Sequence, residues 1–253
     1  MRRDEFRGFY NYIDDLIKSR KSFFVINLWD ANNIYKFIIY EKKILWDRIQ
    51  RTEINEKIKV IISEMKSDTL YRTFQINDKI YNIFIERFRP AFRLIILGAG
   101  HIAVPLVKFA GILGYEAIVI DDRADFANRD RFPDATDIIV KEFDEALDGL
   151  RYDVDTGIVI ITRGHSYDAC CLERVIDKDV SYIGMIGSKR RTMVVMNKMR
   201  ENGISEERIS RVNSPIGLPI GGFSPEEIAL SIISEISCRL NKGEGYLKRL
   251  RSV

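Results

Sequence analysis

The sequence has little of what marks several classes of protein. Its 3 cysteines, two of them adjacent (Cys170 and Cys171), fit neither a disulfide framework nor a zinc finger. The 40 basic residues nearly balance 37 acidic ones, so the net charge of +3 does not favour a general nucleic-acid binder. No apolar run is long enough to span a membrane, and the first twenty residues do not resemble a signal peptide. A reducing cytoplasm is the simplest expectation.

Residues 1–90 predict a small α+β domain. Apolar residues at helical spacing predict helices over 4–19 and 54–65. Runs rich in Phe, Val and Ile predict strands over 22–28, 35–40, 70–76 and 79–86, with a hairpin at 41–43. The many aromatic side chains indicate a packed core rather than a ligand-binding cluster. Residues 87–90 are expected to link this domain to the next, and the aromatic surface makes a homodimer one expectation.

Residues 91–253 predict a Rossmann-like domain with a parallel sheet, because strand and helix patterns alternate from there on. The expected strands are 94–97, 117–120, 137–140, 154–162 and 181–186. The expected helices are one that ends at Leu113, then 167–176, 188–201 and a last one from the N-cap Ser224 to Leu240. The fold class is therefore α/β, preceded by a small α+β domain.

The stretch from Phe92 to Asp122 has the pattern of a dinucleotide-binding strand, turn, helix and strand. Gly98 permits a tight turn, and Gly100 lets the backbone approach a phosphate. Ala103 stands where a third small residue lets helix and strand pack closely. Asp121 and Asp122 end the next strand, where an acid can bind ribose hydroxyls. The pattern predicts a nucleotide or another phosphorylated ligand at the start of the first helix.

The two histidines of the chain both follow strands that should flank the binding crevice. In an open α/β sheet with strand order 3-2-1-4-5, the crevice lies between the first and fourth strands. His101 follows the first strand, and Arg163 and His165 follow the fourth, with Asp168 one helical turn further on. This placement makes His101, His165 and Asp168 candidates for a catalytic or ligand-binding role.

A basic turn follows the fifth strand. Ser188 is a suitable N-cap, but Lys189, Arg190 and Arg191 then place three cations in the first helical turn, where the helix dipole disfavours positive charge. A bound anion would reverse this cost, and so these four residues are predicted to bind an anionic group. A solvated basic face is the alternative.

His165, Asp168 and Cys171 have the spacing of one helical face, which could hold a metal ion or carry sulfur. A buried structural cysteine is the commoner reason for such a pattern, and no metal site is predicted.

Two other functions are compatible with these residues. One is an NAD- or NADP-dependent oxidoreductase with His101 or His165 as the acid–base group. The other is a regulatory module that binds NAD or NADP without turnover. Arg123, directly after the two acids, leaves the choice between NAD and NADP open. Whether the protein is an enzyme is not decided by the sequence.

Four strings in the second domain together resemble the XdhC/CoxI family. They are LIILGAGHIAVPL, ITRGHSYDACCL, YIGMIGSKRR and SPIGLPIGGFSPEEIALSIISEI, in order and with family-like spacing between residues 87 and 242. Members are accessory proteins for xanthine dehydrogenase and related molybdenum hydroxylases. The resemblance implies a maturation factor that binds molybdenum cofactor, works with a cysteine desulfurase and delivers the cofactor to the apoenzyme.

The chain departs from this family in its first domain. Many members carry the cysteine motifs S-G-G-C and C-G-G there, whereas residues 1–90 contain no cysteine. If sulfur or cofactor handling depends on those thiols, this chain must use Cys171 or a second protein.

Overall fold

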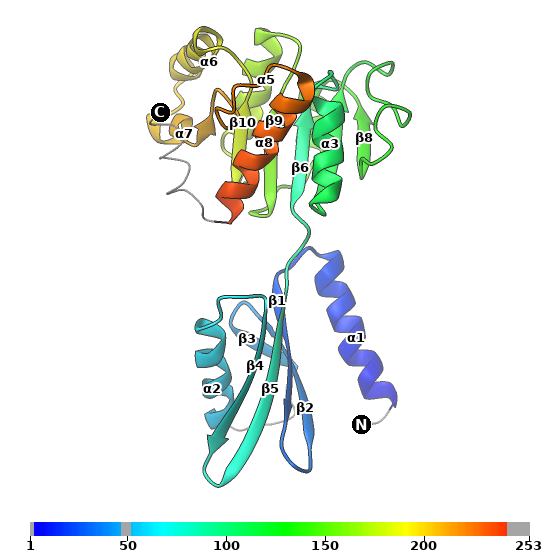
Figure 1. The fold of residues 1–253 in the computed structure, drawn as a ribbon, viewed down its shortest axis with the longest axis vertical. Helices are drawn as coiled ribbons and strands as arrows, with labels where there is room; N and C mark the ends of the chain where they lie inside the picture. The colour runs from blue at the N-terminus through cyan, green and yellow to red at the C-terminus, as the bar shows by residue number, and fades with distance from the viewer. Residues whose placement is uncertain (1–2, 47–51, 242–253) are drawn as a thin grey trace. The chain divides into compact units, whose positions relative to one another are not determined.

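The computed structural model describes residues 3–46 and 52–241, with the side chains of residues 3–6, Trp46 and His165 outside the description. The chain divides into two compact units, Met1–Pro90 and Ala91–Val253, and each is considered by itself. The expected fold class is confirmed: an antiparallel sheet is followed by a parallel sheet with helices (Figure 1).

The N-terminal unit is a five-stranded antiparallel sheet with the order β3-β2-β1-β5-β4. Its strands are β1 (Phe23–Trp29), β2 (Ile34–Tyr40), β3 (Lys43–Trp46), β4 (Thr69–Ile76) and β5 (Lys79–Phe88). Because β5 continues through Phe88, the predicted linker at residues 87–90 is shorter than expected: its first two residues pair with β1.

Two helices cover opposite faces of this sheet. Helix α1 (Arg3–Lys18) packs Phe9 and Leu16 against Phe23 and Val25 of β1. Helix α2 (Thr52–Ser63) packs a row of isoleucines against the other face. Residues of α2 at positions i, i+4 and i+7 are fully buried, namely Ile54, Ile58 and Ile61. This spacing places them on one side of the helix, as the apolar pattern predicts.

The C-terminal unit contains a six-stranded parallel sheet with the order β11-β10-β9-β6-β7-β8. Its strands are β6 (Arg93–Leu97), β7 (Glu116–Asp121), β8 (Asp137–Val140), β9 (Thr156–Ile160), β10 (Tyr182–Met185) and β11 (Val212–Asn213). The first five have the predicted order. The sixth was not predicted, because two residues are too short to show a pattern, and it is recognised only by its pairing with Ile183 and Gly184.

Helices cover both faces of the parallel sheet. On one face lie α3 (Ala103–Ile112) and α8 (Pro225–Leu240), which run side by side (Figure 1). The other face is covered by α4 (Phe143–Asp148), α5 (His165–Val175) and α6 (Lys189–Glu201). Helices α4 and α7 (Glu206–Ser210) were not predicted, since each is shorter than two turns. None of the helices in residues 3–46 and 52–241 is long and apolar enough to span a membrane.

Gly98, directly after β6, lies close to the backbone that follows β9. Its φ is +112°, which residues with a side chain rarely adopt. A Cβ at this position would lie 2.5 Å from the carbonyl oxygen of Ile161, after β9. Gly98 also donates its N–H to the carbonyl of Ile120 in β7, at 2.8 Å. A glycine here therefore lets the first turn lie between the ends of β7 and β9.

Replacing Gly98 with Ala should lower the free energy of unfolding of the parallel-sheet unit by about 3 kcal/mol or more, because strain and a backbone clash add. Gly114 is a matched control, since its φ is +71° but a Cβ added there would meet nothing within 4 Å. Gly114→Ala should cost only about 1 kcal/mol.

Urea unfolding followed by circular dichroism measures both changes. Both tryptophans, Trp29 and Trp46, lie in the N-terminal unit, so tryptophan fluorescence reports that unit separately. Equal losses in the two variants would contradict the role given to Gly98.

Candidate functional site

The candidate site lies at the carboxyl edge of the parallel sheet, where strand order reverses between β6 and β9. Strands β7 and β9 both pair with β6 in parallel register, so that Leu97 lies opposite Ile120 of β7 on one side and Ile160 of β9 on the other. The loops after β6, β7 and β9 therefore start at the same level. Open α/β sheets bind ligands at this kind of position.

The glycine loop after β6 is held in place through both backbone groups of Ala99. The Ala99 N–H donates to Asp121 Oδ2 at 2.8 Å, and Arg131 Nη1 donates to the Ala99 carbonyl at 2.8 Å. Gly100, the next residue, has open space where a side chain would stand. The loop is thus fixed on the protein side and open at Gly100, where a ligand can approach the backbone.

Helix α3 begins directly after this loop without a side-chain cap. Ile102 occupies the N-cap and forms no capping hydrogen bond, and the first turn contains no acid. Ala103 is fully buried, in agreement with the close packing expected of a third small residue. Ala103 donates its N–H to the Gly100 carbonyl at 3.2 Å, and Pro105 has no N–H. Val104 is therefore the residue of the first turn, next to the open glycine, that is suited to donate to an anion.

Asp121 is committed to the protein rather than exposed to a ligand. Its side chain is 2% exposed, and both of its oxygens accept hydrogen bonds. Arg123 donates from Nε to Oδ1 at 2.8 Å and from Nη2 to Oδ2 at 3.0 Å. Burial raises the pKa of Asp121, but the hydrogen bonds from Arg123 and Ala99 outweigh burial and lower that pKa to about 2. Asp121 is therefore a fixed anion that positions the glycine loop.

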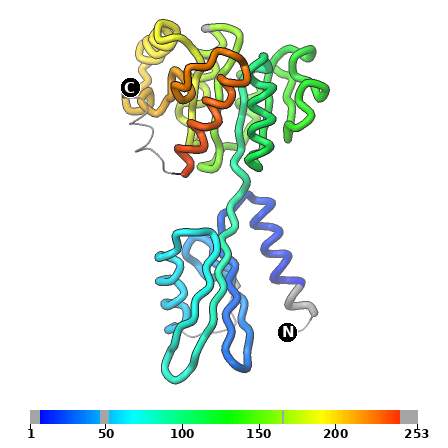
Figure 2. The backbone as a smooth tube through the Cα atoms, viewed as in Figure 1, coloured from blue at the N-terminus to red at the C-terminus, as the bar shows by residue number. Residues whose placement is uncertain are grey.

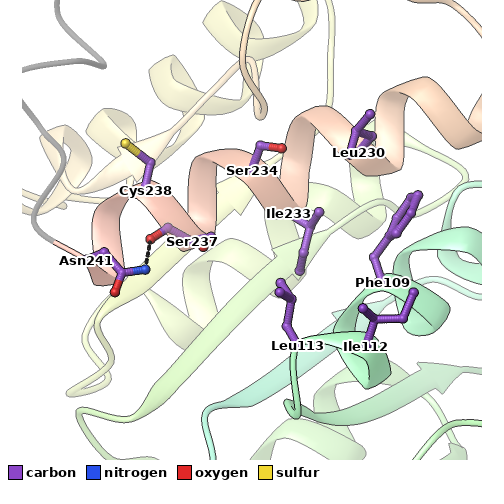
Figure 3. Close-up of a pocket in the computed structure, with 9 residues that line it drawn as sticks. All are labelled: Phe109, Ile112, Leu113, Leu230, Ile233, Ser234, Ser237, Cys238 and Asn241. Carbon is purple, nitrogen blue, oxygen red and sulfur yellow. Dashed lines mark hydrogen bonds between the residues drawn. The ribbon is translucent and has the colours of Figure 1, made fainter. Parts of the chain in front are cut away.

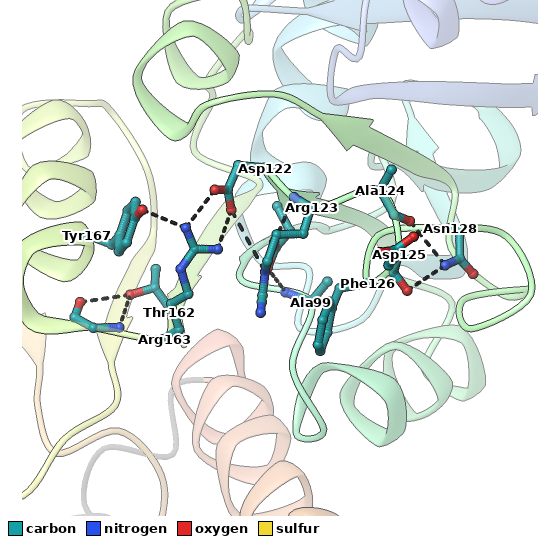
Figure 4. Close-up of polar contacts among 12 residues, drawn as sticks. Ala99, Asp122, Arg123, Ala124, Asp125, Phe126, Asn128, Thr162, Arg163 and Tyr167 are labelled. Carbon is teal, nitrogen blue, oxygen red and sulfur yellow. Dashed lines mark hydrogen bonds and ion pairs between the residues drawn. The ribbon is translucent and has the colours of Figure 1, made fainter.

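Asp122 forms a bidentate ion pair across the edge of the sheet. Arg163, after β9, donates from Nη1 and Nη2 to the two carboxylate oxygens of Asp122, each at 2.7 Å (Figure 4). Arg163 Nη2 also donates to the hydroxyl of Tyr167 at 2.5 Å, and its guanidinium lies 4.4 Å from the Tyr167 ring centroid. Since β7 and β9 flank β6, this pair connects the loops on either side of the glycine loop.

A second buried network joins the loop after β9 to the start of α6. Asp168 is fully buried and accepts from the Thr162 hydroxyl at 2.5 Å. Arg191 donates to the other Asp168 oxygen from both Nε and Nη2. Ser188 caps α6 by accepting the Arg191 N–H at 3.2 Å. Of the predicted basic turn, Lys189 and Arg190 are exposed, whereas Arg191 is bound to Asp168.

Both histidines and the adjacent cysteines belong to the segments that follow β6 and β9. His101 is exposed in the turn before α3, and His165 begins α5, with its side chain outside the described residues. Cys171 is fully buried, which raises the pKa of its thiol far above the ordinary range. Cys170 is exposed. Within the described residues no three or more His, Cys, Asp or Glu side chains gather closely enough to hold a metal ion.

A hollow of about 370 Å³ extends the edge beyond β10. The turn after β10, with Ile186 and Gly187, forms one side of it. The Pro- and Gly-rich segment 215–222 forms the other side, with Ile228 and Ser231 of α8. The composition of this segment indicates irregular structure, but it does not predict a hollow.

Some residues of the site could not be identified from the sequence. Arg131 belongs to no motif, and Tyr167 lies in one of the four quoted strings without a role assigned to it. Their contacts with Ala99 and Arg163 become visible only in the folded chain. The position of Arg123 in the sequence bears on the choice between NAD and NADP, but it does not indicate the ion pair with Asp121.

A larger apolar hollow, of about 620 Å³, lies between α3 and α8 but away from this edge (Figure 3). Its α3 residues, Phe109, Ile112 and Leu113, come from the end of that helix, whereas the glycine loop precedes its start. It is therefore separate from the glycine loop.

Replacing Asp121 with Asn should destabilise the parallel-sheet unit by about 2 kcal/mol at pH 7. This value follows from a pKa near 3.8 for the unfolded chain and about 2 in the folded protein. A lowered folded pKa stabilises the protein above pH 4, and this contribution is lost as the pH falls toward 2.

Urea unfolding of wild type and D121N at pH 7 and pH 3 measures the effect. Asp125→Asn, at an exposed position a few residues away, is the control and should change stability by less than about 0.5 kcal/mol. A difference between wild type and D121N that is the same at both pH values would contradict the assignment.

Comparison with known proteins identifies the family of the parallel-sheet unit. A model of the XdhC Rossmann domain matches residues 94–236. The uncharacterized protein YqeB of Escherichia coli K12 is 31% identical over 166 residues, which are 65% of this chain and 30% of that protein. A probable xanthine dehydrogenase subunit of Bacillus subtilis 168 is 32% identical over 159 residues, 63% of this chain and 46% of that protein.

Two further relatives extend this comparison. The molybdenum cofactor insertion chaperone PaoD of Escherichia coli K12 is 25% identical over 164 residues, 64% of this chain and 45% of that protein. A crystal structure of a xanthine dehydrogenase (BH1974) from Bacillus halodurans is similar with a TM-score of 0.74 and 25% identity, over 95% of this chain and 68% of that one.

This chain spans less than half the length of each of the three curated relatives. The match over residues 94–236 nevertheless covers more than half of the 253 residues and contains the whole carboxyl edge described above. The resemblance expected from the sequence is thus confirmed: the chain belongs to the XdhC family.

Proposed function

We propose that this chain is an accessory factor in the maturation of a molybdenum hydroxylase of the xanthine dehydrogenase type. In this role it binds molybdenum cofactor at the carboxyl edge of its parallel sheet. Family membership supports the proposal, as do the relatives named as a molybdenum cofactor insertion chaperone and a probable xanthine dehydrogenase subunit. The expected partners are a hydroxylase apoenzyme and a cysteine desulfurase. A cytoplasmic location and a homodimer remain predictions.

The observation that carries the proposal is the open backbone at Gly100 beside the uncapped start of α3. Molybdenum cofactor carries a phosphate group, and a phosphate here would accept N–H bonds from the backbone around Gly100 and from Val104, because Ala103 already donates to the Gly100 carbonyl and Pro105 has no N–H. Exposed cations stand on one side of this position, at Lys189 and Arg190, and Arg163 follows β9. The chemistry of these groups fits an anionic ligand.

The other residues of the edge have distinct parts in this proposal. Gly98 and Asp121 fix the loop, and Arg163 exchanges its bond with Asp122 for one with the ligand. The hollow beside Gly187 would receive the planar part of the cofactor, because apolar side chains and glycine backbone line it. When bound, the cofactor supplies the molybdenum chemistry of the client enzyme, and this chain supplies binding and orientation.

Cys171 is poorly suited to carry sulfur. The thiolate is the nucleophilic form of cysteine, and burial holds the pKa of Cys171 far above neutral pH. Cys170 is exposed and is the better candidate in this unit. His101 and His165 remain candidates for proton transfer.

A nucleotide is the alternative ligand, since the strand order β8-β7-β6-β9-β10-β11 is that of dinucleotide-binding sheets. Asp122 would then take the ribose hydroxyls, because both oxygens of Asp121 already accept protein hydrogen bonds. His101 or His165 would serve as the acid–base group in an oxidoreductase, and neither would be needed in an NAD- or NADP-sensing module.

Anaerobic equilibrium dialysis against molybdenum cofactor tests the proposal, together with co-purification of a molybdenum hydroxylase. A thermal-shift panel with NAD(H), NADP(H) and AMP tests the alternative. A ligand at a hundred times its Kd should add about 2.7 kcal/mol of stability. The absence of both cofactor binding and a hydroxylase partner would overturn the maturation role.

Substitution of Arg163 tests the site itself. Arg163→Gln should weaken binding of molybdenum cofactor about tenfold, which corresponds to about 1.4 kcal/mol, because one charged hydrogen-bonding group is lost. Arg174→Gln is the matched control, since Arg174 is an exposed arginine whose partners, Asp144 and Asp148, lie on α4. It should leave the affinity unchanged, and an equal loss in both variants would refute the site.

Asp122→Asn separates the two ligands. It releases Arg163, so that molybdenum cofactor should bind more tightly, whereas a nucleotide held by its ribose should bind more weakly. Dialysis of both ligands against this variant measures the direction of each change. Weaker binding of molybdenum cofactor would contradict the exchange proposed for Arg163.

A further inference from the structure

Among the described residues, helix α2 is shorter than strand β5 of the N-terminal sheet on which it packs. Its 12 residues span about 18 Å, whereas the 10 residues of β5 span about 34 Å. In Figure 2 the β4–β5 hairpin continues past the end of this helix. Each end of α2 accordingly borders a hollow of about 590 Å³. The two hollows are of equal size, so their side chains can be compared directly.

The hollow at the C-terminal end of α2 combines an apolar floor with a basic rim. Its floor consists of partly buried apolar side chains packed against the core, namely Phe24, Ile62 and Met65. Three cations surround them: Lys42 from the turn between β2 and β3, Lys59 from α2, and Arg87 from β5.

Glu41, which lines the hollow, and Glu56, which pairs with the rim cation Lys59, are both engaged. Glu41 accepts a hydrogen bond from the Tyr40 hydroxyl at 2.6 Å, and Glu56 pairs with Lys59 at 2.7 Å. Arg87 instead stacks over Phe24, with its guanidinium carbon 4.8 Å from the ring centroid. Among the lining residues alone, three cations and one acid (Glu41) leave a net charge of +2.

The hollow at the other end of α2 has the opposite charge. Its ionisable lining residues are Glu53, Asp78, Lys79 and Tyr81, and with the tyrosine neutral they carry a net charge of −1. Both hollows belong to one small unit and border one helix, so a general excess of basic residues does not account for the difference. The positive charge is concentrated where the apolar floor is exposed.

The turn that carries Lys42 has an unusual backbone. Glu41 and Lys42 have φ values of +48° and +63°, in the left-handed region that glycine and asparagine normally occupy in such hairpins. Residues held in this conformation are more frequent at ligand-binding positions than elsewhere. Here the turn places a long cationic side chain at the rim, where glycine would place none.

We propose that this basic hollow binds a small organic anion with a planar apolar body. The planar part would lie on Ile62 and Met65, beside the Phe24 ring that Arg87 covers, and the anionic group would face Lys42 and Arg87. A volume near 590 Å³ falls in the range of small-molecule sites, about 300 to 1,000 Å³. All lining residues belong to the N-terminal unit, so this site does not depend on the function proposed for the parallel-sheet unit.

Fluorescence titration of the full chain with 1-anilinonaphthalene-8-sulfonate, a planar aromatic sulfonate, tests the proposal. The double variant Lys42→Gln, Arg87→Gln should weaken binding about tenfold or remove one site per chain, because two charge-assisted contacts are lost. Lys79→Gln removes a cation from the acidic hollow and should change the affinity less than about twofold. The neutral analogue N-phenyl-1-naphthylamine should bind wild type about tenfold more weakly than the sulfonate.

The alternative source of binding is the apolar hollow between α3 and α8, which also would take an aromatic probe. In that case the double variant would bind the sulfonate as wild type does, and the neutral analogue would bind equally well. Either result overturns the proposal. Tryptophan fluorescence shows whether the double variant folds. If it does not, Lys42→Gln alone, in the exposed turn, should still lower the affinity for the sulfonate about threefold.

Discussion

The hydrogen bond from the Ala99 N–H to the buried carboxylate of Asp121 is the contact on which the carboxyl edge depends. It joins the loop after β6 to the last residue of β7. Because both strands start their loops at the same level, one carboxylate is enough to set the position of the glycine turn relative to the sheet. Arg123 neutralises this carboxylate, which allows it to remain charged although it is buried.

Other features of the edge follow from that fixed turn. Arg131 binds the carbonyl of the same residue from the opposite side, and its guanidinium lies 5.0 Å from the Phe126 ring centroid. Arg123 lies over the same ring at 3.8 Å. Phe126 is therefore in contact with two arginines, one that acts through Asp121 and one that binds the loop directly. Two arginines and the ring of Phe126 thus hold residues 98–100, whose only side-chain carbon is the methyl group of Ala99.

The sequence was sufficient to predict the strands from β6 to β10, and the usual order of such sheets, which the structure has, gives the place where the order reverses. Strands β6, β7, β9 and β10 are largely apolar runs buried on both faces, whereas the edge strand β8 is only partly buried. Strand β11 could not be predicted in this way, because two residues are too few to show a pattern of apolar residues. Helices α4 and α7 could not be predicted for the same reason, since each is too short to show a helical repeat.

The side-chain partners were harder to predict than the strands. Asp121 and Arg191 were both expected to face a ligand, but in the structure they bind Arg123 and Asp168. Asp168 and Arg191 are 23 residues apart, and which charges meet across such a distance depends on how two helices pack. A pattern of apolar residues shows which side of one helix or strand is buried, but it does not show which side chains of two elements meet.

The pairing of Asp122 with Arg163 bears on which ions can occupy this edge. An arginine without a partner would attract any abundant anion, including chloride. Here an incoming group must compete with a carboxylate that already offers two oxygens in the geometry that a guanidinium prefers. A monovalent spherical ion cannot replace both bonds, whereas a group with several oxygens and further contacts at the glycine turn can. In the proposed site the ion pair would thus select ligands by competition, before their shape is recognised.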